Sequence, residues 1–283
     1  MNEKIQKVLA NAGVGSRRQI EQWIREGRVI VDGRKAEIGE RVSTNAHLKI
    51  DGREIELVKS TQKRQRVLLY HKPEGEICSR SDPEGRPTIF ERLPLIRNGR
   101  WITIGRLDLN TTGLLLLTND GELANKLMHP SYEIEREYAV RIHGQVAPDV
   151  LTKLRKGVEL DDGLAKFDSI TDAGGTGANH WYHVMVKEGR NRLVRRLWES
   201  QGLEVSRLMR IRFGPISLPP TLKRGQWLEL EKIDINNLTG RDVVEEVEEA
   251  PRGDSKARGR QTHRASVKKP RARFNPRDKR RDA

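Results

Sequence analysis

Two apolar stretches near the middle of the chain set the pattern around which the other elements are arranged. The runs at 101–107 and 114–118 have the length and the aliphatic, β-branched content of strands. A polar loop that ends at Gly113 separates them, so Asp108 is expected where a strand ends. Arg106, two residues earlier, is expected on the same side of the β ladder. A carboxylate held in this way suits chemistry, because the scaffold fixes it while the loop exposes it.

Two other interpretations of this loop compete with a chemical one. Asp and Asn in a polar loop usually serve as turn residues that bond their own backbone, and the local sequence alone favours that role. Asp108, Asn110 and Gly113 also fall at the first, third and sixth positions of a calcium-binding EF-hand loop. The twelfth position is Asn119 instead of Glu, and the flanking segments are strand-like, so the calcium loop is excluded.

Strand patterns and helix patterns both occur over residues 67–238, which we expect to form an α+β body. The expected elements are a strand in VLLYHKP, a long ordered loop in EGEICSRSDPEGRPTIFERLP, a short helix in GELANKLM with Asp120 as its N-cap, a strand in EREYAVRIHG, a helix over 148–157, a hairpin over 163–187, a helix around Leu193 and Leu197, and strands in LMRIRFGPI and QWLELE. In the EREYAVRIHG strand, Tyr138 shares a face with Arg136 and Val140.

The first 60 residues have the pattern of a separate small module. Helical spacing predicts one helix from Ile5 to Ala12, and Ser16 begins a second with Gln19 in the capping-box position. Two β segments follow, RVIVDG and HLKIDGREIELV, each with an Asp-Gly turn signal. The basic residues that stand off the apolar face are Arg17, Arg18, Arg25, Arg28 and Lys35. The polar stretch at 61–66 is expected to be a linker.

The net charge of +14 is concentrated at the two ends of the chain. Residues 1–66 contain 15 Lys and Arg against 9 Asp and Glu, residues 251–283 contain 13 against 3, and residues 67–250 contain 26 against 28. Basic ends on a nearly neutral body favour a polyanionic partner. The segment 239–283, acidic and then rich in Gly, Arg, Lys and Pro, is expected to be a disordered tail. Its basic part, 251–283, is expected to add salt-dependent affinity for a polyanion.

Several protein classes are excluded by what the sequence lacks. It has no run of about 18 apolar residues and no signal-peptide layout, so a cytoplasmic protein without a membrane partner is expected. The single cysteine, Cys78, excludes internal disulfides and CxxC metal sites. His180 and His183 are three residues apart in a predicted strand and so lie on opposite faces, which argues against a metal pair. Nothing indicates an obligate oligomer, and a monomer is expected.

A second segment rich in residues that could carry chemistry is EGRNRLVRRLWESQGLEVSRLMRIR. Between positions 189 and 212 there are seven arginines and two glutamates. Leu193 and Leu197 lie on one side of the predicted helix, and Arg192, Arg195 and Arg196 spread over the remainder. A cationic helix face is commonly only a solvated surface, so RNA binding and simple solvation both remain open on charge alone.

Taken together, these motifs resemble those of pseudouridine synthases of the small-ribosomal-subunit type, the branch with an N-terminal S4 RNA-binding domain. The resemblance covers residues 1–235. It rests on HKPEGEICSRSDPEGRPT, GRLDLNTTGLLLLTNDGELANKLMHP, EREYAV and EGRNRLVRRL, in that order, together with the Ser-Arg-Arg helix start and the RVIVDG turn. It implies an S4 domain over 1–60 and a catalytic domain over 67–238. The catalytic domain would have a mixed, mainly antiparallel sheet flanked by helices, with its active site in a basic cleft.

The resemblance also assigns roles to individual residues. Asp108 becomes the essential aspartate, Tyr138 stacks on the target base, and Arg195 pairs with the Asp108 carboxylate. Arg106 fills the gap left by an extruded uridine. The RNA-contacting residues implied are Arg190, Arg192, Arg196 and the basic residues of the N-terminal module. The chain departs from many members at Arg192 and Leu193, where they have His-Gln.

The implied reaction converts a uridine of ribosomal RNA into pseudouridine, without redox change or a departing group, and so needs no cofactor and no metal. The loop PEGEICSRSDPEGRPTIFERLP (residues 73–94) and the basic tail are most similar to members acting on the large subunit (23S) RNA, either free or in an assembly intermediate. Competing hypotheses are a ribosome-assembly protein that only binds RNA, and the same reaction on another ribosomal RNA. A glycosidase-like hydrolase would need a second carboxylate, and only Asp120 is close.

Overall fold

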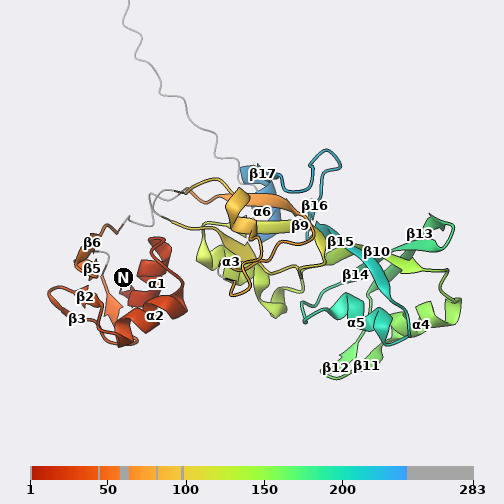
Figure 1. The fold of residues 1–283 in the computed structure, drawn as a ribbon, viewed down its shortest axis with the longest axis horizontal. Coiled ribbons are helices and arrows are strands. Elements are labelled where there is room, and N and C mark those ends of the chain that lie inside the picture. Colours follow the sequence, from red (N-terminus) through yellow and green to blue (C-terminus); the bar gives the residue numbers. More distant parts are fainter. Residues whose placement is uncertain (1, 44, 58–63, 81, 97–98, 241–283) are drawn as a thin grey trace, which may run out of the picture. The chain divides into compact units, whose positions relative to one another are not determined.

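The computed structural model describes residues 2–240, apart from 44, 58–63, 81 and 97–98. These residues form an α+β fold, as predicted, with a small N-terminal module and a larger body built on a mixed, mainly antiparallel sheet (Figure 1). Half of the predicted linker, residues 61–63, and nearly all of the predicted tail, residues 241–283, lie outside the described residues. Within the described part of the chain, no helix has the length and apolar character needed to cross a membrane.

The N-terminal module follows its sequence pattern closely. Helix α1 spans Ile5–Asn11 and α2 spans Arg17–Arg25, with the Ser16 hydroxyl accepting a hydrogen bond from the Gln19 amide at 3.1 Å. The short strands are β1 (Glu3–Lys4), β2 (Val29–Val31), β3 (Arg34–Lys35), β4 (Arg41–Val42), β5 (Leu48–Ile50) and β6 (Arg53–Ile55). Strands β3, β2, β5 and β6 form one sheet, whose alternate residues pack with both helices in a single apolar core.

The body is organised by nine strands. They are β7 (Val67–Lys72), β8 (Ile102–Ile104), β9 (Thr112–Thr118), β10 (Arg136–His143), β13 (Ser169–Thr176), β14 (Asn179–Val186), β15 (Val205–Phe213), β16 (Ile216–Ser217) and β17 (Trp227–Glu229). The main order is β13-β14-β10-β15-β9-β7-β17, with β16 beside β15 and β8 beside β9. Every pairing is antiparallel except that of β9 with β15.

Strands β7 and β9 form the central part of one half of the sheet. All of their residues are buried, which agrees with their continuous apolar runs. One face packs against α3 (Gly121–Met128) and α6 (Lys232–Thr239). The other face packs against the long loop predicted after β7, which includes a 3-10 turn at Ile89–Arg92. Asp120 caps α3 as predicted, accepting from the amides of two residues of its first turn.

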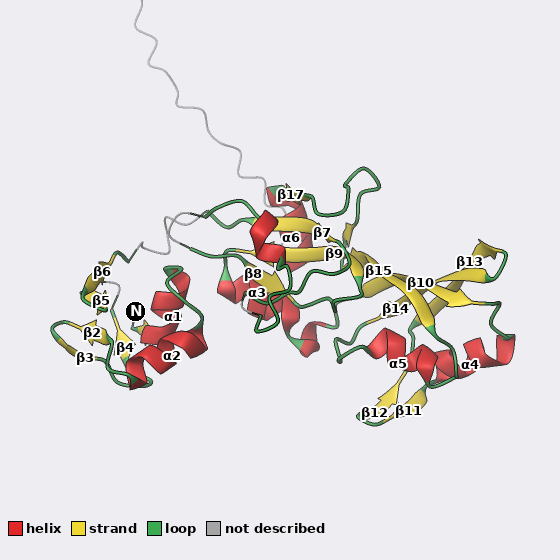
Figure 2. Ribbon diagram, viewed as in Figure 1, coloured by secondary structure: helices red, strands yellow, loops and turns green. Residues whose placement is uncertain are grey.

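The other half of the sheet consists of β13, β14, β10 and β15. Figure 2 shows α4 (Pro148–Lys156) and α5 (Leu193–Glu199) along one side of it, and their apolar residues share a core with these strands. The predicted hairpin over 163–187 is shorter than expected. Residues 163–165 belong to β12 (Gly163–Ala165), which pairs with β11 (Val158–Leu160), and the hairpin proper is β13 with β14.

The strand predicted before Asp108 is also shorter than its apolar run. It ends at Ile104, because Gly105 has a left-handed backbone with φ of +76°. Residues 105–111 therefore form a loop, and the prediction that Arg106 and Asp108 share one side of a ladder was wrong. Gly113 does not end this loop but lies within β9, which starts at Thr112.

Candidate active site

The loop at 105–111 presents a half-buried carboxylate. The Asp108 side chain makes no hydrogen bond or ion pair with any residue that the structure describes, whereas its own carbonyl accepts from the Thr111 amide at 3.1 Å. The turn role considered for Asp108 is thus filled by its backbone. The carboxylate itself remains available to a ligand.

Lys72, the last residue of β7, binds the backbone of this loop. Its side chain is fully buried, and Nζ donates to the carbonyl oxygens of Asp108 at 3.1 Å, Leu109 at 3.4 Å and Thr111 at 3.0 Å, and also to that of Pro73 at 2.9 Å. Burial lowers the pKa of the ammonium group, while the nearby acidic groups, Asp108 among them, oppose that shift. The carbonyl dipoles compensate a buried charge that has no carboxylate bonded to it.

Arg195, in the first turn of α5, holds the loop from the other half of the sheet. Its Nη2 donates to the carbonyl of Asn110 at 2.8 Å and its Nη1 to that of Val205 at 2.9 Å. The predicted ion pair between Arg195 and the Asp108 carboxylate is not formed in this structure. The guanidinium donates to backbone carbonyl oxygens instead, and burial lowers its pKa. Two buried cations therefore bind the carbonyls of all four residues from 108 to 111.

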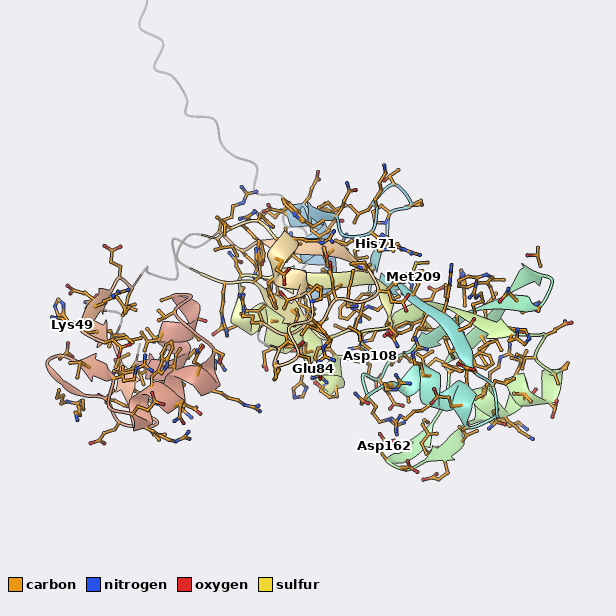
Figure 3. The ribbon with its side chains drawn as sticks, viewed as in Figure 1. Lys49, His71, Glu84, Asp108, Asp162 and Met209 are labelled. Carbon is orange, nitrogen blue, oxygen red and sulfur yellow. The ribbon has the colours of Figure 1, made fainter. Side chains whose placement is uncertain are left out.

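A pocket of about 510 Å³ opens in front of Asp108, a volume in the range of small-ligand sites. Its lining comes from the 102–111 segment, the end of α3, strands β10 and β15, and the segment leading into α5. The charged residues that line it are Arg106, Asp108, Arg136, Glu188, Arg190, Arg192 and Arg210. Figure 3 shows Asp108 close to the region where the two halves of the sheet join, marked by Met209. Five arginines against two carboxylates make this a basic pocket.

Tyr138 and Arg106 both line this pocket. Tyr138 lies on β10 on the same face as Arg136, as the alternation predicted, and its half-buried ring packs against two of the apolar cores of the body. Arg106 is exposed at the rim. The structure thus brings three of the predicted residues, Asp108, Tyr138 and Arg106, to one cavity. Arg195 lies behind the loop and does not line it.

Three other arginines of the arginine-rich segment at 189–212 bind acidic residues of the protein. Arg196 forms a two-bond pair with Asp162 at 2.9 and 2.8 Å, and Arg190 contacts Asp162 at 3.1 Å and Glu188 at 2.6 Å. Arg192 is exposed and reaches Glu199 at 3.4 Å. Because Glu188 is paired with Arg190, the pocket offers no second free carboxylate, which argues against the glycosidase-like hydrolase.

The basic residues of the N-terminal module are mostly exposed. Arg17, Arg18, Arg25 and Lys35 have exposed side chains. Arg28 differs, because it makes two hydrogen bonds to Asp51 at 2.8 and 2.6 Å and lies over the Trp23 ring. Arg28 is therefore partly neutralised, whereas the other four present their charge to solvent.

Sequence reasoning missed Lys72, Arg136 and Arg210 as site residues. Lys72 carried a signal, since a lysine at the end of an otherwise apolar strand must find buried acceptors. Metal chemistry has no candidate ligand cluster among the described residues. His180 bonds Asp172 at 2.6 Å, and His183 faces Glu137 at 3.6 Å, so the two imidazoles have separate partners.

Comparison with known proteins shows the family to which the chain belongs. Residues 66–200 match the model described as RNA pseudouridylate synthase, and residues 3–48 match the S4 domain model. A solved pseudouridylate synthase shares the fold, with a TM-score of 0.59 and 24% identity over 83% of this chain and 99% of that one. Named relatives are 58% identical over most of the chain. The chain therefore belongs to the RNA pseudouridylate synthases, which are isomerases.

Those relatives carry the name ribosomal large subunit pseudouridine synthase B. The protein of Salmonella typhimurium is 58% identical over 242 residues, which cover 85% of this chain and 83% of the relative. That of Pseudomonas aeruginosa is 58% identical over 240 residues, which cover 84% of this chain and 62% of the relative. The small-subunit type that the motifs suggested is not borne out, because the relatives are named for the large subunit.

Proposed function

We propose that this chain isomerises one uridine of large-subunit (23S) ribosomal RNA to pseudouridine. The observation that carries the proposal is the Asp108 carboxylate, which is unpaired and faces a basic pocket while its backbone is fixed by two buried cations. The names of relatives at 58% identity support the choice of RNA. A protein that only bound RNA would require no such free carboxylate.

The reaction needs an ionised carboxylate beside the ribose. Asp108 acts on the sugar either as a nucleophile at C1′ or as a base at C2′. The N1–C1′ bond breaks, the uracil turns, C5 bonds to C1′, and the proton of C5 is lost while N1 gains one. Substrate and product have the same atomic composition, so no oxidant, reductant or co-reactant is needed. In the nucleophilic route, the bond from Asp108 to C1′ forms as N1–C1′ breaks and is itself broken when C5 bonds to C1′.

Tyr138 and Arg106 serve the flipped nucleotide in this proposal. The Tyr138 ring forms a wall of the pocket and offers a stacking surface for the uracil, a contact worth about 1–3 kcal/mol. Taking a base out of its stack costs a few kcal/mol. Arg106, exposed at the rim, is placed to fill the vacancy in the RNA. Arg195 is a positioning residue that acts through the Asn110 carbonyl.

The N-terminal module supplies affinity for the RNA backbone. Its exposed cations, Arg17, Arg18, Arg25 and Lys35, can bind phosphates without reading the sequence. We place the protein in the cytoplasm as a monomer that acts on free large-subunit RNA or on an assembly intermediate. Arg190, Arg192 and Arg196 join RNA binding only if their exposed ion pairs open.

Asp108→Asn tests the proposal directly, because it removes the charge and nearly preserves the shape. Wild type and variant are given ribosomal RNA from a strain lacking the enzyme, pseudouridine is mapped chemically, and RNA affinity is measured in parallel. We expect one mapped position to be modified by wild type alone, with similar affinities for both proteins. Pseudouridine formed equally by both would refute the role of Asp108. If wild type binds and forms none, the binding-only function is favoured.

A further inference from the structure

A buried arginine at the base of the pocket has donors without acceptors. Arg210 on β15 is 2% exposed, yet it is among the residues that line the cavity. Its Nε donates to the Leu114 carbonyl at 2.7 Å. Nη2 is buried without a hydrogen-bond partner, and no carboxylate among the described residues pairs with the guanidinium. A buried donor left unpaired is costly, which indicates that a ligand completes the site.

A second arginine adds to this unbalanced charge. Arg136 on β10 also lines the pocket and gives its Nη1 to the carbonyls of Ile134 and Lys187 at 2.7 and 2.6 Å. Both guanidinium groups lie over the Phe213 ring, at 5.3 Å for Arg136 and 5.4 Å for Arg210. Burial, together with the charge of Arg210, lowers the pKa of Arg136. The base of the pocket is therefore positively charged and lacks a fixed counter-charge.

The sheet register places Arg210 next to the proposed base-stacking residue. Tyr138 and Arg210 are direct cross-strand partners, so their side chains stand on one face of the sheet about 5 Å apart at Cβ. Ile211 is an extra residue in β15 at this point, and the resulting bulge turns Phe213 to the same face as Arg210. A base that stacks on Tyr138 therefore has its edge close to Arg210.

We propose that Arg210 is a catalytic residue that donates to a carbonyl oxygen of the target uracil and stabilises the uracil anion. This inference rests on the proposed function. When N1–C1′ breaks, its electron pair leaves with the base and spreads over the ring and both carbonyl oxygens. The pair returns to carbon as C5 bonds to C1′. A donor aimed at the place where this charge develops lowers the barrier to cleavage.

The depth of Arg210 favours the base over a phosphate as its ligand. A phosphate belongs to the RNA backbone and stays near the surface with its own solvation. Only a flipped base can enter a pocket to a side chain that is 2% exposed. Arg192 and Arg106, both exposed around the opening, are the arginines placed for phosphate.

The test combines substitutions of Arg210 with replacement of a uracil carbonyl oxygen by sulfur in the RNA. Arg210→Met and Arg210→Lys are compared with Arg207→Met, the matched control on the same strand, whose side chain is exposed and does not line the pocket. The substrate is a large-subunit RNA fragment with uridine, 2-thiouridine or 4-thiouridine at the mapped position, because sulfur is the weaker acceptor. Single-turnover rates and RNA affinities are measured for each combination of protein variant and RNA substrate.

We expect Arg210→Met to lower the single-turnover rate on the uridine-containing RNA by about 10²- to 10³-fold. Removal of one such donor has an effect of this size in other enzymes. The same substitution should slow one of the two thio-substituted RNAs by less than about tenfold, since that contact is already weakened. Arg207→Met should react as wild type does. An equal loss on all three RNAs, or no loss, overturns the proposal.

Arg210→Lys keeps the inference testable if the methionine variant does not fold. The ammonium retains the charge and one donor direction, so we expect an intermediate loss with the same dependence on the thio substitution. Wild-type rates for this variant on all three RNAs would overturn the proposal. If wild type forms pseudouridine and Asp108→Asn does not, the proposed function stands whatever the Arg210 variants show.

Discussion

Lys72 Nζ lies 3.1 Å from the carbonyl oxygen of Asp108, although 36 positions separate the two residues in the sequence. The cation binds the backbone of the aspartate and leaves its carboxylate free. An ion pair with the carboxylate would have blocked the group that the proposed reaction needs. The two cations bind the loop through its carbonyls, whereas the side chain of Asp108 lines the pocket.

Replacing Lys72 by methionine should destabilise the protein. The change keeps most of the side-chain volume but removes the Lys72 donor from the carbonyls of Pro73 and Thr111, at about 1–3 kcal/mol for each one that water cannot reach. The Asp108 carbonyl keeps only the Thr111 amide as its donor. We expect the free energy of unfolding to fall by roughly 3 kcal/mol or more in urea titrations. Lys156→Met, the same change at an exposed position of α4, should leave it nearly unchanged. Equal stabilities of the two variants would contradict this role.

Gly113→Ala should be severely destabilising for a reason beyond backbone conformation. Gly113 has a φ of +105°, and a Cβ at this position would meet the Arg210 carbonyl oxygen at 2.2 Å. Gly163 has a similar φ of +103° with open space around it. Gly163→Ala should therefore cost only the left-handed strain of about 1–2 kcal/mol. Thermal unfolding of both variants tests whether the close approach of β9 and β15 matters, and similar melting temperatures would show that it does not.

Arg195→Lys should slow catalysis more than it weakens RNA binding. A lysine can reach only one of the two carbonyls that the guanidinium bridges, so the Asn110 end of the loop should shift. Small displacements of a catalytic group cost up to about 10²-fold in rate. We expect kcat to fall between about 10- and 100-fold with KM nearly constant. A rise in KM with unchanged kcat would instead identify Arg195 as an RNA contact.

Asp162 should make the stability depend on pH in the acid range. Its hydrogen bonds to Arg196 lower the pKa of this carboxyl in the folded protein, whereas an unfolded aspartate titrates near about 3.9. The stabilising contribution is thus complete above about pH 4 and is lost as the pH falls through the lower folded value. Unfolding curves of wild type and Asp162→Asn between about pH 6 and pH 2 should converge at the acid end. A constant difference over that range would contradict the assignment.

The sequence correctly predicts those structural features that depend on residues close together in the chain. Ser16 and Asp120 were recognised as helix caps from their immediate neighbours, and β7 and β9 from continuous apolar runs. The shared face of Tyr138 and Arg136 followed from alternation alone. These features depend on neighbours within a few positions, so no tertiary information was required.

The residues that sequence reasoning misplaced depend on long-range contacts. Arg195 and Arg196 are adjacent and chemically alike, but one holds the Asn110 carbonyl and the other holds Asp162. In β15, Arg210 lines the pocket whereas Arg212 binds Glu135 and Glu137, because the bulge at Ile211 breaks the alternation that would otherwise place the two arginines on one face. A bulge has no sequence signal strong enough to locate it in advance.

In the part of the chain that the structure describes, the ladder that joins the two halves of the body's sheet consists of two residue pairs of β9 and β15, Met209 with Thr112 and Arg210 with Gly113. The Asp108 loop takes Lys72 from one half and Arg195 from the other. Neither half could assemble the site alone, so catalysis by this chain reports on completed folding. If Asp108 is the catalytic group, a chain whose halves have not yet joined lacks an assembled site, and we expect it to form no pseudouridine.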